Sequence, residues 1–195
     1  RNRVRELVCN YTKDNNALDE DIVTEKIIRD IDSLNIHRTP LNCLLLLKFN
    51  EQAFEESPVN RTEMIGRVLF MLFFQFDAIP RYATRPDLKD CEYALGYLSE
   101  CLLRKNTSSF TKKEFFDYIQ EYCKSHLLDL DCEILFTILT FEKILIQKNT
   151  EYQFRFTYWL YFFAAHRMHH DENFADYILS EKRYAIYPEI IEFYT

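Results

Sequence analysis

The chain has 195 residues, of which 48% are hydrophobic; this is enough for one large or two small folded domains and excludes a disordered segment. The formal net charge of −7 argues against a nucleic-acid surface, because phosphate binding needs a dense local excess of Lys and Arg. No apolar run approaches the ~20 residues that cross a bilayer, so we expect no membrane contact and a cytoplasmic location. We also expect a piece of a larger protein, since the chain starts in a helical pattern without an initiator methionine.

Residues 1–79 carry helical periodicity and predict a first helical domain. Thr39 is a favourable N-cap and Pro40 a favourable first residue for a helix through the apolar run 41–49, which we expect to be buried on nearly all sides. After a turn at Ser57-Pro58, Asn60 is expected to begin a long helix that ends near position 77. An earlier helix is predicted from the apolar stripe Ile22, Ile27, Ile28, Ile31 and Leu34.

A linker at 79–87 contains Pro80 and Pro86 and predicts the boundary to a second domain, residues 80–170. Helices are predicted at about 86–105, from a capping box at 111–114, and at about 131–142. The alternating segments 144–147 and 152–156 then predict a short β-hairpin. Helices followed by a two-stranded ribbon are typical of a winged helix.

An aromatic helix to about residue 169 and two short helices complete the chain, with 171–195 beginning a further helical region. The predicted fold class is therefore mainly α, a helical bundle followed by a winged-helix unit with one short β-hairpin.

The sequence contains no recognisable catalytic motif. The six cysteines lie far apart without paired spacing, so we interpret them as reduced core thiols. The two glycines, Gly66 and Gly96, each stand alone in a helical pattern, whereas a phosphate-binding loop needs several close together. We therefore predict no catalytic residue and no enzyme activity for this chain alone.

Two segments can be interpreted either as ordinary structural elements or as functional sites. His166 and His170 have the spacing to share a helix face and hold a metal, but a polar helix end followed by Asp171 as the next N-cap is the favoured interpretation, and no metal site is predicted. The aromatic run 158–165 could stack on bases, but it has no interleaved basic residues, so core packing is favoured.

Two patterns together resemble the signal-transducing NTPases of the NACHT and STAND type. The first is Arg38-Thr39-Pro40 followed by the leucine-rich stretch 41–47, similar to the helix whose proline packs on the bound adenine in that family. The second resembles the family pattern F-x-H-x-x-F-x-E-[FY]-x-A-A at the end of a winged helix. Phe156 occupies the position of the histidine that contacts phosphate, and Tyr161 that of the acidic residue. The positions that correspond to the family pattern are Phe154, Trp159, Phe162, Ala164 and Ala165.

The resemblance implies the regulatory helical and winged-helix portion of a STAND NTPase, possessing no P-loop core of its own. Such a portion closes over bound ADP and controls ligand-triggered oligomerisation when ATP binds, and similar bacterial proteins act in antiviral defence. ATP or ADP with Mg²⁺ would be bound by the parent protein, and none by this chain alone. The nucleotide-proximal residues implied are Thr39, Pro40 and Leu41 at the adenine, with Arg155 and Phe156 at the phosphates.

The sequence leaves other classes open. A helical protein–protein interaction module without a nucleotide role is the main alternative. A winged-helix nucleic-acid binder is less favoured, because its recognition helix at about 131–142 would carry Asp131, Glu133 and Glu142. The expected partners are a nucleotide held through the absent core and a protein ligand or further copies of the protein, without nucleic acid or membrane.

Overall fold

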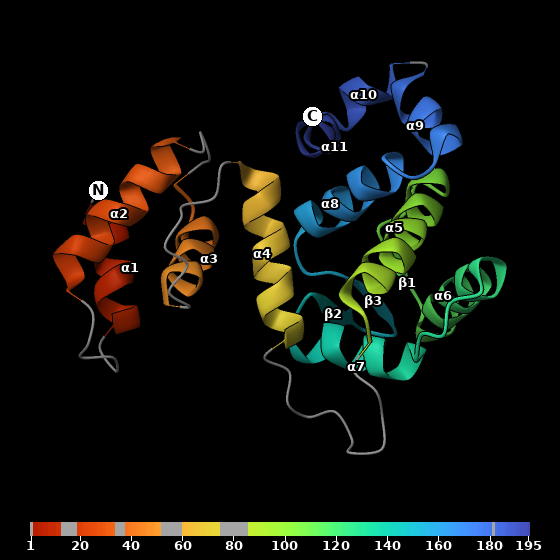
Figure 1. Ribbon diagram of the computed structural model, residues 1–195, viewed down its shortest axis with the longest axis horizontal. Helices are drawn as coiled ribbons and strands as arrows, with labels where there is room; N and C mark the ends of the chain where they lie inside the picture. Colours follow the sequence, from red (N-terminus) through yellow and green to blue (C-terminus); the bar gives the residue numbers. More distant parts are fainter. Residues whose placement is uncertain (1, 13–18, 34–37, 52–59, 75–85, 181) are drawn as a thin grey trace. The chain divides into compact units, whose positions relative to one another are not determined.

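The structure is a computed structural model that describes residues 2–12, 19–33, 38–51, 60–74, 86–180 and 182–195 (Figure 1). The chain divides into two compact units, Arg1–Met71 and Leu72–Thr195, which are described separately below. The predicted turn at Ser57-Pro58 and most of the predicted linker at 79–87 lie outside the described residues. The domain boundaries expected near 79 and 170 stay predictions.

Unit 1 contains the helices α1 (Asn2–Thr12), α2 (Glu20–Ser33) and α3 (Pro40–Glu51), which pack on one another, and α4 (Arg61–Phe74) begins in it. The side chain of Asp19 accepts hydrogen bonds from the backbone N–H groups of Asp21 and Ile22, at 3.0 and 3.2 Å, and so caps α2. The predicted stripe on α2 is partly wrong, because Ile22 is 67% exposed. Ile27 and Ile31 are buried as predicted, Ile28 is half-buried, and Leu34 lies outside the described residues. Val23, which was not part of the predicted stripe, is buried with them, since a spacing of four residues keeps side chains on one helix face.

Unit 2 is built on α5 (Leu88–Arg104), α6 (Lys112–His126) and α7 (Cys132–Phe141). Each is preceded by an N-cap residue whose side chain accepts hydrogen bonds from the first backbone N–H groups of the helix: Asp87, Thr111 and Asp131. The capping box predicted at Thr111 and Glu114 is confirmed, with both reciprocal hydrogen bonds present. These local signals explain why the three predicted helices appear where the sequence places them.

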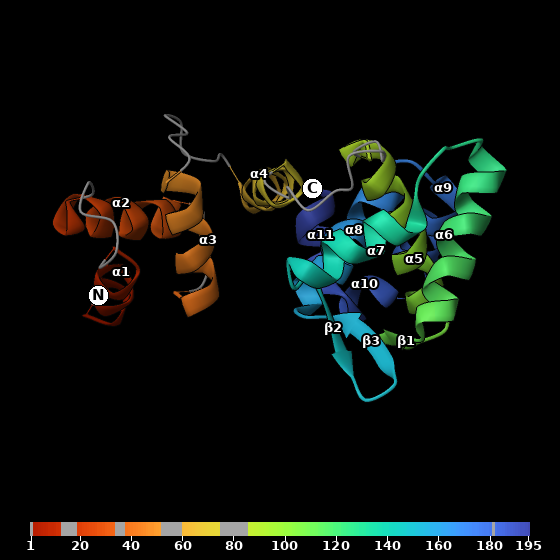
Figure 2. The same cartoon turned by 90° about the horizontal axis from the view of Figure 1, so that it is seen from below.

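A small antiparallel sheet has the strand order β1-β3-β2. The predicted hairpin is confirmed as β2 (Leu145–Lys148) and β3 (Glu151–Phe154), with Asn149 in its turn at a φ of 57°. A third strand, β1 (Ser109–Phe110), pairs with β3 and was not expected, because two residues are too short to show alternation. Figure 2 shows the three strands together at one edge of unit 2. The chain is therefore mainly α with one short hairpin, as predicted.

The C-terminal helices are α8 (Thr157–Met168), α9 (Glu172–Leu179), α10 (Arg183–Ile186) and α11 (Pro188–Tyr194). Helix α8 packs between α5 and α11, and its aromatic residues fill the core: Trp159 and Phe163 are 2% and 0% exposed. The interpretation of the aromatic run as core is confirmed. No helix formed by the described residues has the length and apolar character to cross a membrane.

The two glycines provide a test of this packing. A methyl group at Gly96 would lie 3.1 Å from Cβ of Arg167 and 3.2 Å from the carbonyl oxygen of Phe163, whereas at Gly66 nothing lies within 4 Å. We expect Gly96→Ala to lower the free energy of unfolding by about 1 kcal/mol, because α8 must shift. The control Gly66→Ala should raise it by about 0.5–1 kcal/mol through helix propensity. Urea unfolding followed by circular dichroism measures both, and equal stabilisation by the two changes would contradict the close contact.

Candidate functional site

The first group of predicted site residues lies at the start of α3 in unit 1. The Thr39 hydroxyl accepts a hydrogen bond from the backbone N–H of Asn42 at 3.2 Å, so the predicted N-cap is confirmed. Thr39 and Pro40 are exposed, and Leu41 lies in the first turn, with its side chain outside the description. The expected burial of α3 on nearly all sides is wrong at Leu44, which is 40% exposed, although Cys43, Leu46 and Leu47 are buried.

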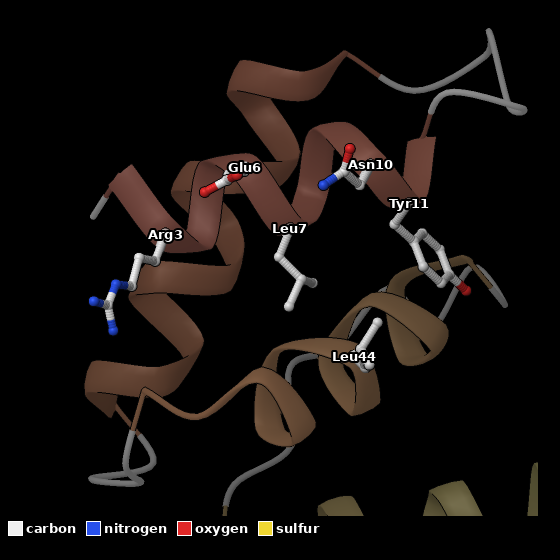
Figure 3. Close-up of a pocket in the computed structure, with 6 residues that line it drawn as sticks. All are labelled: Arg3, Glu6, Leu7, Asn10, Tyr11 and Leu44. Carbon is white, nitrogen blue, oxygen red and sulfur yellow. The ribbon is translucent and has the colours of Figure 1, made fainter.

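That exposed leucine lies in an open groove of ≈ 520 Å³ between α1 and α3, which Figure 3 shows. Leu7 and Tyr11 project from α1 toward α3, where Leu44 points back toward them. Arg3, Glu6 and Asn10 form the polar rim of the groove. An apolar floor with a mixed polar rim suits contact with another protein surface better than chemistry on a small substrate.

The second group of predicted site residues lies between β3 and α8 in unit 2. The backbone N–H of Arg155 donates to the carbonyl of Ile144 at 2.8 Å and so extends the hairpin by one bond. The Arg155 guanidinium lies 5.1 Å from the centre of the Phe156 ring, which stacks on Tyr158 at 5.7 Å. Phe156 is also the N-cap residue of α8 and makes no side-chain cap. An exposed cation therefore lies beside a helix N-terminus whose first N–H groups have no side-chain cap.

A buried ionic cluster joins α5 to α8 and was not predicted. Arg167, whose side chain is 10% exposed, donates from Nε to Glu100 at 2.9 Å and from Nη2 to Asp171 at 2.6 Å. The other carboxylate oxygen of Glu100 accepts from Arg104 Nε at 2.8 Å. Asp171 also caps α9 through the N–H of Phe174, which confirms the predicted cap. The cluster thus ties α5, α8 and α9 together through charge-assisted hydrogen bonds.

Aromatic rings complete the surroundings of Arg167. The guanidinium carbon lies 5.6 Å from the ring centres of both Tyr97 on α5 and Tyr122 on α6. These cation–π contacts replace water on a group that stays charged at every relevant pH. The sequence signal that could have indicated the cluster is a pair of i, i+4 ion pairs, Glu100 with Arg104 and Arg167 with Asp171, on otherwise apolar helices.

The predicted shared face of His166 and His170 is confirmed, since their ring centres lie 4.9 Å apart. His166 Nε2 lies 3.7 Å from a carboxylate oxygen of Glu92 on α5, and its Nδ1 has no hydrogen-bond partner among the described residues. Burial lowers the pKa of His166 to about 4, and burial raises the pKa of Glu92 to about 7. Among the described residues, no three His, Cys, Asp or Glu side chains are arranged to hold a metal ion.

Burial makes several of the thiols poor nucleophiles at neutral pH. All six cysteines are free. Burial raises the pKa of both Cys101 and Cys132 to about 11 and also raises that of Cys91. The thiolate is the reactive form, so these groups are unreactive in the folded chain.

The comparisons with known proteins indicate a class for one segment. Residues 108–164 are associated with the STAND-type NTPases. The family whose model they match is Novel STAND NTPase 4. The matched segment runs from just before β1 into α8, so it includes the whole sheet together with Arg155 and Phe156. The search of curated proteins finds no match for the chain, and neither does the search of solved structures.

The buried cluster generates a prediction about stability. We expect Arg167→Met to lower the free energy of unfolding by about 2–3 kcal/mol, because it leaves two carboxylates partly unpaired in a buried place. Arg104→Met is the matched control; its side chain is 40% exposed, so the loss should be about 0–1 kcal/mol. Urea unfolding followed by the fluorescence of Trp159, the single tryptophan, measures both. Equal losses of unfolding free energy in the two variants would show that burial of Arg167 adds nothing to its effect on stability.

The pair of Glu92 and His166 generates a prediction about pH. Because the pKa of Glu92 is raised in the folded chain, the contribution of Glu92 to stability falls as the pH rises from about 4.5 to 7. Because the pKa of His166 is lowered, the contribution of His166 falls in the other direction, as the pH decreases from about 6.5 to 4. We expect Glu92→Gln to stabilise the chain by about 1–2 kcal/mol at pH 8 and to have little effect at pH 4.5. Thermal unfolding at both pH values measures this, with the exposed Glu172→Gln as control. A gain that does not depend on pH would refute the buried-carboxylate explanation.

Proposed function

We propose that this chain is the regulatory helical and winged-helix portion of a STAND NTPase. In this proposal it closes over ADP bound to a separate P-loop core and moves outward when ATP and a ligand favour an open, oligomer-forming state. The cellular role that fits the resemblance is antiviral defence. Catalysis then belongs to the core of the parent protein, which also binds the nucleotide and Mg²⁺.

The observation that carries the proposal is the match of residues 108–164 to a STAND NTPase family model. The order α5, β1, α6, α7, β2, β3 supports a winged-helix assignment for the same region, since a helix and strand are followed by two helices and a hairpin. Fold order alone does not fix function, so the family match is the stronger argument.

Local geometry supports a nucleotide near both groups of predicted site residues. Arg155 is exposed beside the N-terminus of α8, where the helix dipole and uncapped N–H groups favour an anion such as a phosphate. Pro40 is exposed at the N-terminus of α3, where its ring is available to pack on an adenine face. Both glycines lie inside helices, α4 and α5, so neither belongs to a phosphate-binding loop.

The charge of α7 argues against a nucleic-acid partner. Its residues 132–141 include no Lys or Arg, and Glu133 and Thr137 are exposed along it. Lys112 lies 3.4 Å from Glu133 and forms an ion pair with it. A helix with this surface would repel a phosphate backbone.

A protein–protein interaction module without a nucleotide role is the second candidate. The groove between α1 and α3 favours it, because an open apolar floor is available for a partner. The two candidates differ in whether the full-length protein retains nucleotide.

Nucleotide retention by the purified full-length protein tests the proposal. We expect bound ADP after purification, and we expect Pro40→Ala to weaken its retention about tenfold by removing an apolar contact. Pro188→Ala is the matched control, because Pro188 also opens a helix, α11, but is not predicted to be near the nucleotide. Chromatographic analysis of the nucleotide released on denaturation measures the content.

Two outcomes would contradict the proposal. One is an ADP content that is unchanged in Pro40→Ala or equally reduced in Pro188→Ala, which would remove the adenine contact. The other is a full-length sequence without a GxxxxGK[ST] loop ahead of this chain, which would exclude the NTPase assignment altogether.

A further inference from the structure

Helix α7 is unusually apolar for a helix at a surface. Figure 1 shows it at the edge of unit 2. Surface helices normally carry charged and polar residues on the side that faces away from the core, whereas Glu133 is the single charged residue between Cys132 and Phe141. The inner side of α7 is buried through Leu135, Phe136, Ile138 and Leu139. The side that remains outside is therefore largely apolar as well.

The outer side of α7 carries Ile134, Thr137 and Phe141, and we call these three residues the α7 face. Spacings of three and four residues place them next to one another on one side of the helix. Phe141 is 63% exposed, Thr137 is exposed and Ile134 is half-buried. The Thr137 hydroxyl donates to the carbonyl of Glu133 at 2.7 Å, so its polar atom is already used within the helix. The α7 face is thus a continuous strip about 10 Å long from Ile134 to Phe141.

Opposite charges lie at the two ends of the α7 face. Asp131 and Glu133 are exposed at the N-terminal end, where Glu133 also forms an exposed ion pair with Lys112. Lys143 is exposed beyond the C-terminal end, next to the half-buried Glu142, and a φ of 59° turns the chain out of the helix there. A strip with an apolar centre, carboxylates at one end and an ammonium group at the other is complementary to itself when turned through 180°.

We propose that the α7 face is the contact surface of a symmetric dimer, with a second copy of this chain as its occupant. The two α7 helices would lie antiparallel about a two-fold axis beside Thr137. Ile134 and Phe141 lie 3.5 positions on either side of a point midway between residues 137 and 138, so Phe141 of each copy would cover Ile134 of the other. Lys143 would lie opposite position 132 of the other copy, between Asp131 and Glu133.

A second copy suits the α7 face better than other occupants do. Nucleic acid and anionic lipid are disfavoured, because residues 132–141 include no Lys or Arg. A partner helix carrying charges of one sign would meet the same sign at one end of the face, whereas a second copy satisfies both ends. The strip covers only about two helical turns, which is less than the ~800 Å² per partner of a standard interface, so the dimer is weak. This contact needs no nucleotide and is separate from the ATP-triggered oligomer of the proposed function.

Sedimentation velocity of the whole chain without nucleotide tests the proposal. The buffer contains about 0.15 M salt, which largely screens the repulsion between two copies that each carry a net charge of −7. We expect a monomer at about 1 μM and a reversible shift toward a dimer at about 200 μM. Association should stop at the dimer, because a two-fold contact uses the same surface on both copies and closes on itself.

Single substitutions locate the contact. Phe141→Ser should weaken dimerisation about tenfold, because its apolar contact is lost twice. Thr137→Lys should weaken it at least tenfold, because each new cation would face its own copy across the two-fold axis. Ile186→Ser is the matched control: Ile186 is 67% exposed on α10, which Figure 1 shows on the other side of unit 2, and this variant should dimerise as the unchanged chain does. All three side chains are exposed, so the melting curves should not change.

A charge exchange tests the antiparallel orientation. Lys143→Glu should weaken dimerisation about threefold, because it places a carboxylate beside Asp131 and Glu133 of the other copy. Adding Glu133→Lys to the same chain should restore most of the lost association, because the reversed charges again meet their opposites on both sides of the axis.

Four results would overturn the proposal. The first is a chain that stays monomeric at about 200 μM, and the second is association that continues beyond the dimer. The third is an equal loss of association in Ile186→Ser and Phe141→Ser. The fourth is a charge-exchanged chain that associates no better than Lys143→Glu alone, which would exclude the antiparallel pairing. Nucleotide plays no role in these measurements, so failure here leaves the proposed function unaffected.

Discussion

Burial of the Arg167 guanidinium between α5 and α8 is the constraint on which the arrangement of unit 2 depends. The group cannot lose its charge, so every face of it must be paired or covered. Glu100 and Asp171 supply the paired charges, and the rings of Tyr97 and Tyr122 cover the guanidinium. These partners come from α5, α6 and the start of α9. One side chain of α8 thus contacts three other elements at once.

The cluster is better explained by its effect on the position of α8 against its neighbouring helices than by a net gain in stability. Removing a guanidinium and two carboxylates from water costs about as much as their attraction returns, so apolar residues could fill the same space. Apolar residues would, however, also tolerate α8 shifted by a turn, whereas the 2.9 Å and 2.6 Å hydrogen bonds of Arg167 fit a single position. Gly96 belongs to the same constraint, because it allows the backbone of α8 to come close enough for these bonds.

The features that could be predicted from the sequence are those set by neighbouring residues. The caps at Thr39, Thr111 and Asp171 follow from hydrogen bonds over three residues, and the hairpin follows from alternation around a polar turn. Arg167 and Glu100 are 67 residues apart, and no local pattern pairs them. Strand β1 depends equally on a distant partner, β3. The roles of Pro40 and Arg155 toward one nucleotide stay predictions, since they lie in different units.

Helix α8 connects the segment matched to the STAND NTPase family with the C-terminal helices. Its N-cap is Phe156, beside the proposed phosphate contact, and Arg167 lies three residues beyond the end of the matched segment. A switch requires contacts that differ between two states, and a buried ion cluster resists partial opening because each broken pair exposes an unpaired charge to an apolar interior. Under the proposed function, α5, α8 and α9 would therefore move together as one body. The hinge of such a movement would have to lie outside these helices, and not at the junction of α8 and α9 where Asp171 pairs with Arg167.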